Sequence, residues 1–134
     1  MNTFGITTLS ERPFDETIVE VTKALQVSGF GVLTDIDIKS TLKTKLDVEF
    51  PKYRILGACN PDFAYEALQL EALAGVFLPC SIVVREREDQ QVEVTAIDPS
   101  AAMQIAENAE LQTLTLKIKA KLETVIQAVG GGEL

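Results

Sequence analysis

The sequence has 134 residues, 46% of them hydrophobic and 24% charged, which is typical of one soluble globular domain. Its 12 Lys and Arg against 20 Asp and Glu give a net charge of -8, which disfavours nucleic acids and anionic membrane surfaces as partners. The absence of histidine excludes Ser-His-Asp and Cys-His catalysis and histidine-ligated zinc. Neither a signal peptide nor a membrane span is recognisable, and two cysteines are too few for a secreted disulfide framework, so we expect a cytoplasmic protein.

The first part of the chain predicts a strand, a helix and a second strand. The alternation over residues 4–9 is typical of a strand, and residues 14–28 carry apolar side chains at helical spacing behind an acidic first turn. Gly29 stands where a left-handed C-terminal cap is expected. Residues 30–36 then predict the second strand.

Two further helices are expected before the next pair of strands. Asp37 is a suitable N-cap for a short helix over 38–46, whose lysines we interpret as a solvated face. Residues 53–58 predict the third strand, and Asn60 then caps a helix that is expected to run to residue 73 or 74.

A hairpin is predicted around a three-residue loop at 88–90. The register that best separates apolar from charged side chains places Ile82 opposite Ala96. On the other face it places Arg85 opposite Glu93. This pairing predicts an antiparallel sheet with one buried face.

The C-terminal part is predicted to be helical. Asp98-Pro99-Ser100 opens a helical region that Asn108 breaks, and the main helix is expected over about 110–129. Its apolar stripe must lie on the sheet or on a partner; the stripe consists of Leu111, Leu114, Ile118, Leu122, Val125 and Val129. With neither a linker nor a repeat in the sequence, residues 1–134 are expected to form one domain.

Both cysteines lie next to the helix that follows the third strand. Cys59 ends that strand and Cys80 begins the next, so the two thiols are expected to meet at one end of the sheet if the strands are antiparallel neighbours. Cys59 also precedes a helix N-terminus, where the dipole favours an anionic sulfur. Two thiols placed in this way could form a reversible disulfide, bind a soft metal ion or attack an electrophile. The simpler alternative, which we favour, is that both are small buried hydrophobic residues.

The remaining polar candidates surround this segment. Tyr53, Arg54 and Asn60 are expected to border the thiols and to line a pocket for a small anionic ligand, although Asn60 already has a role as an N-cap. Asp35 and Asp37 share one face of a strand, where helix capping explains them more simply than a hard cation. A zinc site needs four ligands, so Cys59 and Cys80 alone do not predict one within a single subunit.

Several of these segments together resemble the bacterial and archaeal domain-of-unknown-function family 302. The matching segments are Gly29-Phe30-Gly31-Val32, Asp35-Ile36-Asp37, Tyr53-Arg54-Ile55-Leu56-Gly57-Ala58-Cys59-Asn60-Pro61, Leu78-Pro79-Cys80 and Asp98-Pro99. Their order and spacing fit over roughly residues 14–129. The resemblance implies an α+β fold similar to the TATA-binding-protein-like class, in which an antiparallel sheet packs against helices. The expected order is β-α-β-β-β-β-α with an extra helix between the third and fourth strands. It also implies a homodimer, and it brings no established activity, substrate or cofactor.

The sequence therefore predicts a cytoplasmic small-ligand or protein-binding module that acts as a homodimer. Its cleft is expected between the sheet and its helices, near the cysteines, with no cofactor. The alternative is a thiol redox or soft-metal protein that uses the same two cysteines. The candidate site residues are Cys59, Cys80, Asn60, Pro61, Tyr53 and Arg54.

Overall fold

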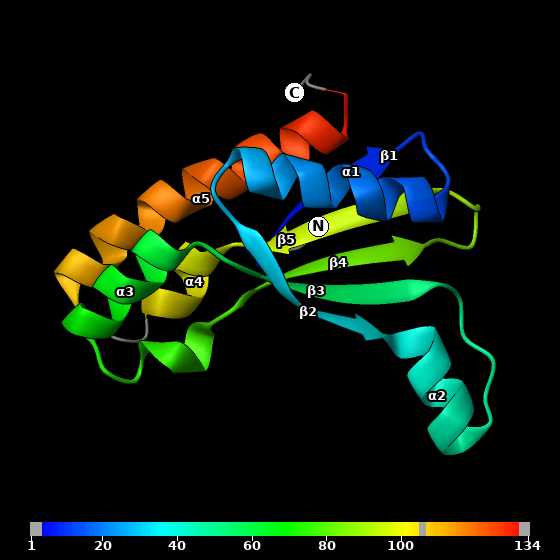
Figure 1. Cartoon of the computed structure of the whole chain (residues 1–134), viewed down its shortest axis with the longest axis horizontal. Coiled ribbons are helices and arrows are strands. Elements are labelled where there is room, and N and C mark those ends of the chain that lie inside the picture. Colours follow the sequence, from blue (N-terminus) through cyan, green and yellow to red (C-terminus); the bar gives the residue numbers. More distant parts are fainter. Residues whose placement is uncertain (1–3, 105–106, 132–134) are drawn as a thin grey trace.

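A computed structural model describes residues 4–104 and 107–131 of the chain. Its framework is a five-stranded antiparallel sheet in the order β1-β5-β4-β3-β2 (Figure 1). The strands are β1 Gly5–Ser10, β2 Gly31–Asp37, β3 Tyr53–Cys59, β4 Cys80–Glu86 and β5 Val92–Ile97. Every neighbouring pair is antiparallel, as the sequence predicts.

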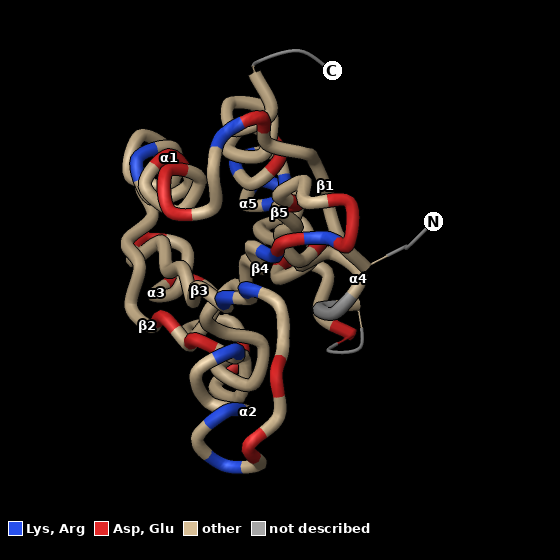
Figure 2. The backbone as a smooth tube through the Cα atoms, turned by 90° about the vertical axis from the view of Figure 1, so that its right-hand side faces the viewer, with Lys and Arg blue, Asp and Glu red and all other residues tan. Residues whose placement is uncertain are grey.

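The helices are α1 Phe14–Val27, α2 Ile38–Leu46, α3 Pro61–Leu70, the 3-10 helix η1 Ala74–Phe77, α4 Pro99–Met103 and α5 Ala109–Val129. The long helices α1 and α5 lie side by side on one face of the sheet, whereas α2 projects on the opposite side (Figures 1 and 2). The main elements thus follow the predicted β-α-β-β-β-β-α order, with α2 and α3 added. Within the described residues, no helix combines the length and apolar character that a membrane crossing requires.

The β4–β5 hairpin has the predicted register. Ile82 pairs with Ala96, and Arg85 pairs with Glu93. The guanidinium of Arg85 donates two hydrogen bonds to the carboxylate of Glu93, from Nε at 2.9 Å and from Nη2 at 3.2 Å. The alternation of side chains was sufficient to find this register because a shift by one residue exchanges the two faces.

The core lies between the inner face of the sheet and the two long helices. Alternate residues of each strand point to this face, and the apolar stripes of α1 and α5 pack against them. The largest fully buried apolar side chains are Val21, Leu25, Leu56, Ile82, Val84, Val94, Leu111, Leu122, Val125 and Ile126. The stripe predicted for the C-terminal helix therefore lies on the sheet and on α1.

The two predicted helix caps, Asp37 and Asn60, are present, and Asn108, which was expected to break the helical region, is a third cap. Asp37, Asn60 and Asn108 each accept a hydrogen bond from the backbone N–H three residues later, at 2.9, 3.2 and 3.0 Å. Gly29 adopts a φ of +87° after α1, as expected for a left-handed C-terminal cap. The caps at Asp37, Asn60 and Gly29 depend only on neighbouring residues, which is why the sequence reveals them.

The end of α3 differs from the prediction of residue 73 or 74. The helix stops at Leu70, whose carbonyl accepts a hydrogen bond from the side chain of Asn108 at 3.2 Å. Glu71 is extended, with φ -151° and ψ 110°, and its carboxylate accepts from the N–H of Leu73 at 2.9 Å. A contact between segments far apart in the sequence therefore ends this helix early.

Candidate functional site

The two cysteines lie at the same end of the sheet, but on opposite faces. Cys80 pairs with Ala58, and Cys59 is the next residue along β3. Because consecutive strand residues alternate, Cys80 points to the helices and Cys59 to the other face. Both thiols are free, Cys80 buried and Cys59 half-buried. The expected meeting of the two thiols is therefore wrong, although the antiparallel pairing that suggested it is right.

The environment of Cys80 favours the neutral thiol. Burial, with a smaller contribution from Cys59, raises the pKa of the Cys80 thiol from 9.0 to about 11. The thiolate is the reactive and metal-binding form, so this position disfavours nucleophilic and ligand chemistry at neutral pH. Among the described residues, no group of three or more His, Cys, Asp or Glu is arranged to hold a metal ion.

This pKa shift predicts a pH-dependent stability. Between pH 9.0 and about 11 the unfolded chain releases the Cys80 proton while the folded chain retains it, so stability falls as pH rises. We expect the free energy of unfolding of the wild type, relative to Cys80→Ala, to decrease by about 2 to 3 kcal/mol across this window. Urea unfolding of both proteins at several pH values measures it. A difference that stays constant from pH 8 to pH 11 would contradict a buried neutral thiol.

Tyr53 and Arg54 do not border the thiols. They begin β3 whereas Cys59 ends it, which separates them from Cys59 by about 16 to 20 Å at about 3.3 Å per strand residue. The guanidinium of Arg54 donates to the carboxylate of Asp35 from Nε at 2.8 Å and from Nη2 at 2.5 Å. This hydrogen bonding lowers the pKa of Asp35. It also engages the guanidinium of Arg54, which was expected to bind an anionic ligand.

Asn60 and Pro61 begin α3 at the thiol end of the sheet. The side chain of Asn60 is buried and caps the helix, and Pro61 takes the first helical position. Of the six candidate site residues predicted from the sequence, Asn60 lines a groove beside α3. The structure therefore divides the sequence-based candidates between two ends and two faces of the sheet.

The groove runs between α3 and α5. Its first part has a volume of about 440 Å³ and is lined by Glu66, Gln69, Leu70, Glu110, Thr113, Leu114 and Lys117. A second part of about 380 Å³ shares Glu66, Leu114 and Lys117 and continues to Asn60, Phe63, Ile118, Lys121 and the end of α1. Together they are within the size range of small-molecule sites.

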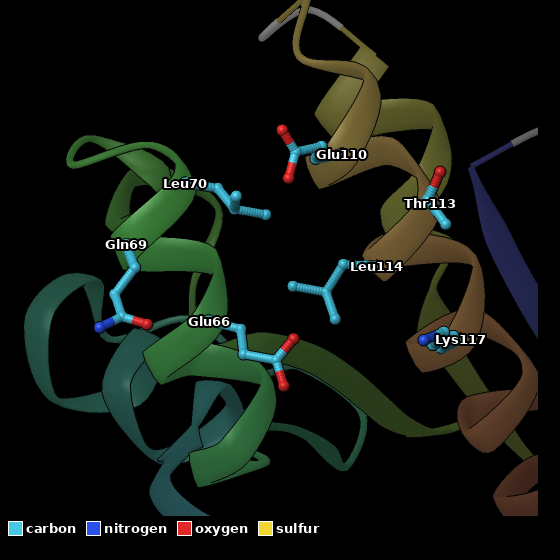
Figure 3. Close-up of a pocket in the computed structure, with 7 residues that line it drawn as sticks. All are labelled: Glu66, Gln69, Leu70, Glu110, Thr113, Leu114 and Lys117. Atoms are coloured by element: carbon cyan, nitrogen blue, oxygen red, sulfur yellow. The ribbon is translucent and has the colours of Figure 1, made fainter.

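The first part of the groove combines an apolar centre with charged ends. Figure 3 shows Leu70 of α3 and Leu114 of α5 pointing toward one another, with the carboxylates of Glu66 and Glu110 extending into the same space. Glu66, Glu110, Lys117 and Lys121 form no ion pair with another described residue. Their charges are thus available to a ligand.

The sequence alone did not indicate this groove. Glu66 is the outward residue of an amphipathic helix, and Lys117 and Lys121 are spaced like any solvated helix face. What joins them is the packing of α3 on α5, two helices more than 35 residues apart in the chain. The side chain of Asn108 also donates a hydrogen bond to the carbonyl of Leu70. This tertiary contact joins segments far apart in the chain, so the spacing of side chains in the sequence does not indicate it.

The fold belongs to the α+β class and consists of an open antiparallel sheet with the long helices α1 and α5 packed on one face. Residues 6–129 match the family model described as "Domain of unknown function DUF302", and the chain belongs to that family. It is also similar to a solved structure, "Crystal structure of uncharacterized conserved protein DUF302 from Bacillus stearothermophilus". The TM-score is 0.89 at 26% identity, over 96% of this chain and 99% of that one. The search of curated proteins found no match.

Proposed function

We propose that this protein is a small-ligand-binding module acting as a homodimer, with its ligand in the groove between α3 and α5. The observation that carries the proposal is the apolar centre formed by Leu70 and Leu114, flanked by the carboxylates of Glu66 and Glu110, which have no ion-pair partner among the residues that the structure describes. A few polar groups around an apolar surface are typical of small-molecule sites. The proposal places the protein in the cytoplasm, where free thiols such as Cys59 and Cys80 stay reduced.

The charges of the groove favour a zwitterionic ligand with an aliphatic body. Glu66 and Glu110 suit an ammonium group at the Leu70 end of the groove. Lys117 and Lys121 suit a carboxylate toward the end at Asn60. An aliphatic chain between the two charges would lie over Leu70 and Leu114, and its burial contributes to affinity in proportion to the apolar area covered.

A role in thiol redox chemistry or soft-metal binding has less support. Its basis is the placement of both cysteines at one end of the sheet. Against it, the two side chains point to opposite faces, and burial holds the pKa of Cys80 at about 11. We therefore assign the ligand site to the groove.

Titration with 6-aminohexanoate tests the groove, with hexylamine and hexanoate as ligands that lack one charge. We expect amide NMR shifts at Glu66, Leu70 and Leu114, and weaker binding of both single-charge ligands. Glu66→Gln is expected to lower the affinity for 6-aminohexanoate by about threefold, as for a solvent-exposed ion pair. Glu123→Gln, an exposed position on α5 outside the groove, is the matched control and should leave the affinity unchanged.

Two results would overturn the assignment. One is the absence of shifts in α3 and α5 with all three ligands. The other is an equal loss of affinity in Glu66→Gln and Glu123→Gln, which would show a non-specific effect of net charge.

A further inference from the structure

Helix α3 is apolar around most of its circumference. Its polar side chains, Asp62, Glu66 and Gln69, form one row at the helical spacing i, i+4 and i+7. One apolar side of the helix, which includes Phe63 and Ala67, is buried in the core. The opposite side is also apolar, but it lies open to solvent. Because a helix that is apolar all round is typically covered all round, the open side of α3 is expected to have a partner.

The open side of α3 continues into η1 as one apolar surface, which we call the α3–η1 patch. Its members are Pro61, Tyr65, Leu68, Leu73 and Val76. The large side chains from Tyr65 to Val76 in this set are between 43 and 78% exposed. A Cβ atom built on Gly75 of η1 would lie 3.9 Å from Cδ2 of Leu68, so the two segments are within van der Waals distance. Contiguous exposed apolar side chains of this size mark interaction sites.

The border of the α3–η1 patch is acidic. Asp62 and Glu66 lie along one side of it, and neither forms an ion pair with another described residue. Residues 55–84 contain these two carboxylates and Glu71, and they contain neither Lys nor Arg. A partner that covers the patch therefore gains from cations placed against Asp62 and Glu66. An anionic partner, including an anionic membrane surface, would be repelled by the same two carboxylates.

The form of the patch suits a helix. Pro61, Tyr65 and Leu68 follow one another at i, i+4 and i+7, so they form a ridge along α3 that is about 10 Å long. Side-chain ridges of this kind pack into the grooves on the surface of a second helix. About two or three turns of an amphipathic helix would cover the ridge and also contact η1. Figure 1 shows that α3 lies at the end of the molecule, beyond the sheet, where the second helix has room.

We propose that the α3–η1 patch binds a basic amphipathic helix of another protein. The apolar side of that helix covers Tyr65, Leu68 and Val76, and its Lys or Arg side chains pair with Asp62 and Glu66. Burial of the apolar area supplies most of the affinity, because exposed ion pairs contribute little. The inference goes beyond the proposed function, since Tyr65, Leu68 and Val76 line neither part of the groove.

Fluorescence anisotropy with synthetic peptides tests the chemistry of the partner. The probe is a labelled peptide of about 14 residues, with leucine along one side of the helix and lysine along the other. We expect this leucine–lysine peptide to bind the wild type. A peptide with serine in place of leucine is expected to bind at least about tenfold more weakly, because it loses the apolar contact. A peptide with glutamate in place of lysine is expected to bind more weakly still, because it meets the acidic border.

Substitutions in the patch test the place of binding. Leu68→Ser and Val76→Ser are each expected to lower the affinity for the leucine–lysine peptide by about tenfold, because each removes an apolar contact inside the interface. Both side chains are exposed in the free protein, so the fold should be retained, which circular dichroism checks. Val19→Ser, at a position that is 51% exposed on α1, is the matched control and should leave the affinity unchanged. Asp62→Asn is expected to lower the affinity by about threefold, as for an exposed ion pair.

Four results would overturn the proposal. The leucine–lysine peptide fails to bind at about 100 µM, or the serine–lysine peptide binds as tightly, which would show attraction by net charge alone. Leu68→Ser and Val19→Ser lose the same affinity, or a self-association of the wild type in sedimentation is abolished by Val76→Ser, which would assign the patch to a second copy. Titration of Leu68→Ser with 6-aminohexanoate keeps the two sites distinct, because an unchanged affinity for this ligand supports the groove whatever the peptide does.

Discussion

Replacing Gly57 by alanine is expected to lower the free energy of unfolding by about 3 kcal/mol, at the upper end of overpacking costs. Gly57 is buried in the central region of the sheet, on β3 between β2 and β4. A Cβ atom built on it would overlap Oγ1 of Thr34 and lie 2.8 Å from Cγ of Pro79. Thr34 belongs to β2, and the ring of Pro79 cannot rotate away, so the backbone must shift.

Urea unfolding monitored by circular dichroism measures this loss. Gly31→Ala is the matched control, because Gly31 is also a strand residue and a Cβ there meets no atom within 4 Å. Gly31→Ala should change stability by less than about 1 kcal/mol. Adding Thr34→Ala to Gly57→Ala should recover part of the loss. Equal effects of the two glycine substitutions would show that conformational entropy, and not overlap, decides the result.

Leu122→Ala is expected to destabilise the protein by about 3 kcal/mol, the middle of the range for buried leucines. The Leu122 side chain is fully buried in the core, on the face of α5 that packs against the sheet and α1. Its truncation leaves a cavity that the surrounding strands and α1 can fill only in part.

Leu116→Ala on the same helix is the control for helix propensity. Leu116 is 56% exposed, so its truncation should cost less than about 1 kcal/mol. The difference between the two variants in chemical unfolding isolates the burial of the α5 stripe. A similar cost for both would mean that α5 is not anchored on the sheet through Leu122.

Much of the fold can be predicted from short stretches of the sequence. The register of the β4–β5 hairpin follows from the alternation of apolar and charged side chains, which puts Ile82 and Arg85 on opposite faces. The caps at Asp37 and Asn60 follow from side chains that reach backbone groups three residues away. Local geometry decides these features, so local patterns predict them.

The candidate functional site was decided by tertiary structure. The two thiols were expected to meet, yet the pairing of Ala58 with Cys80 turns Cys59 to the opposite face. Arg54 was a candidate for ligand binding, but its guanidinium is held by Asp35 of a neighbouring strand. The groove exists only because α3 packs on α5 and the side chain of Asn108 ends α3 at Leu70. Side-chain periodicity assigns residues to the faces of their own helix or strand, whereas a site depends on which faces of separate elements meet, and that is set by the packing of the whole chain.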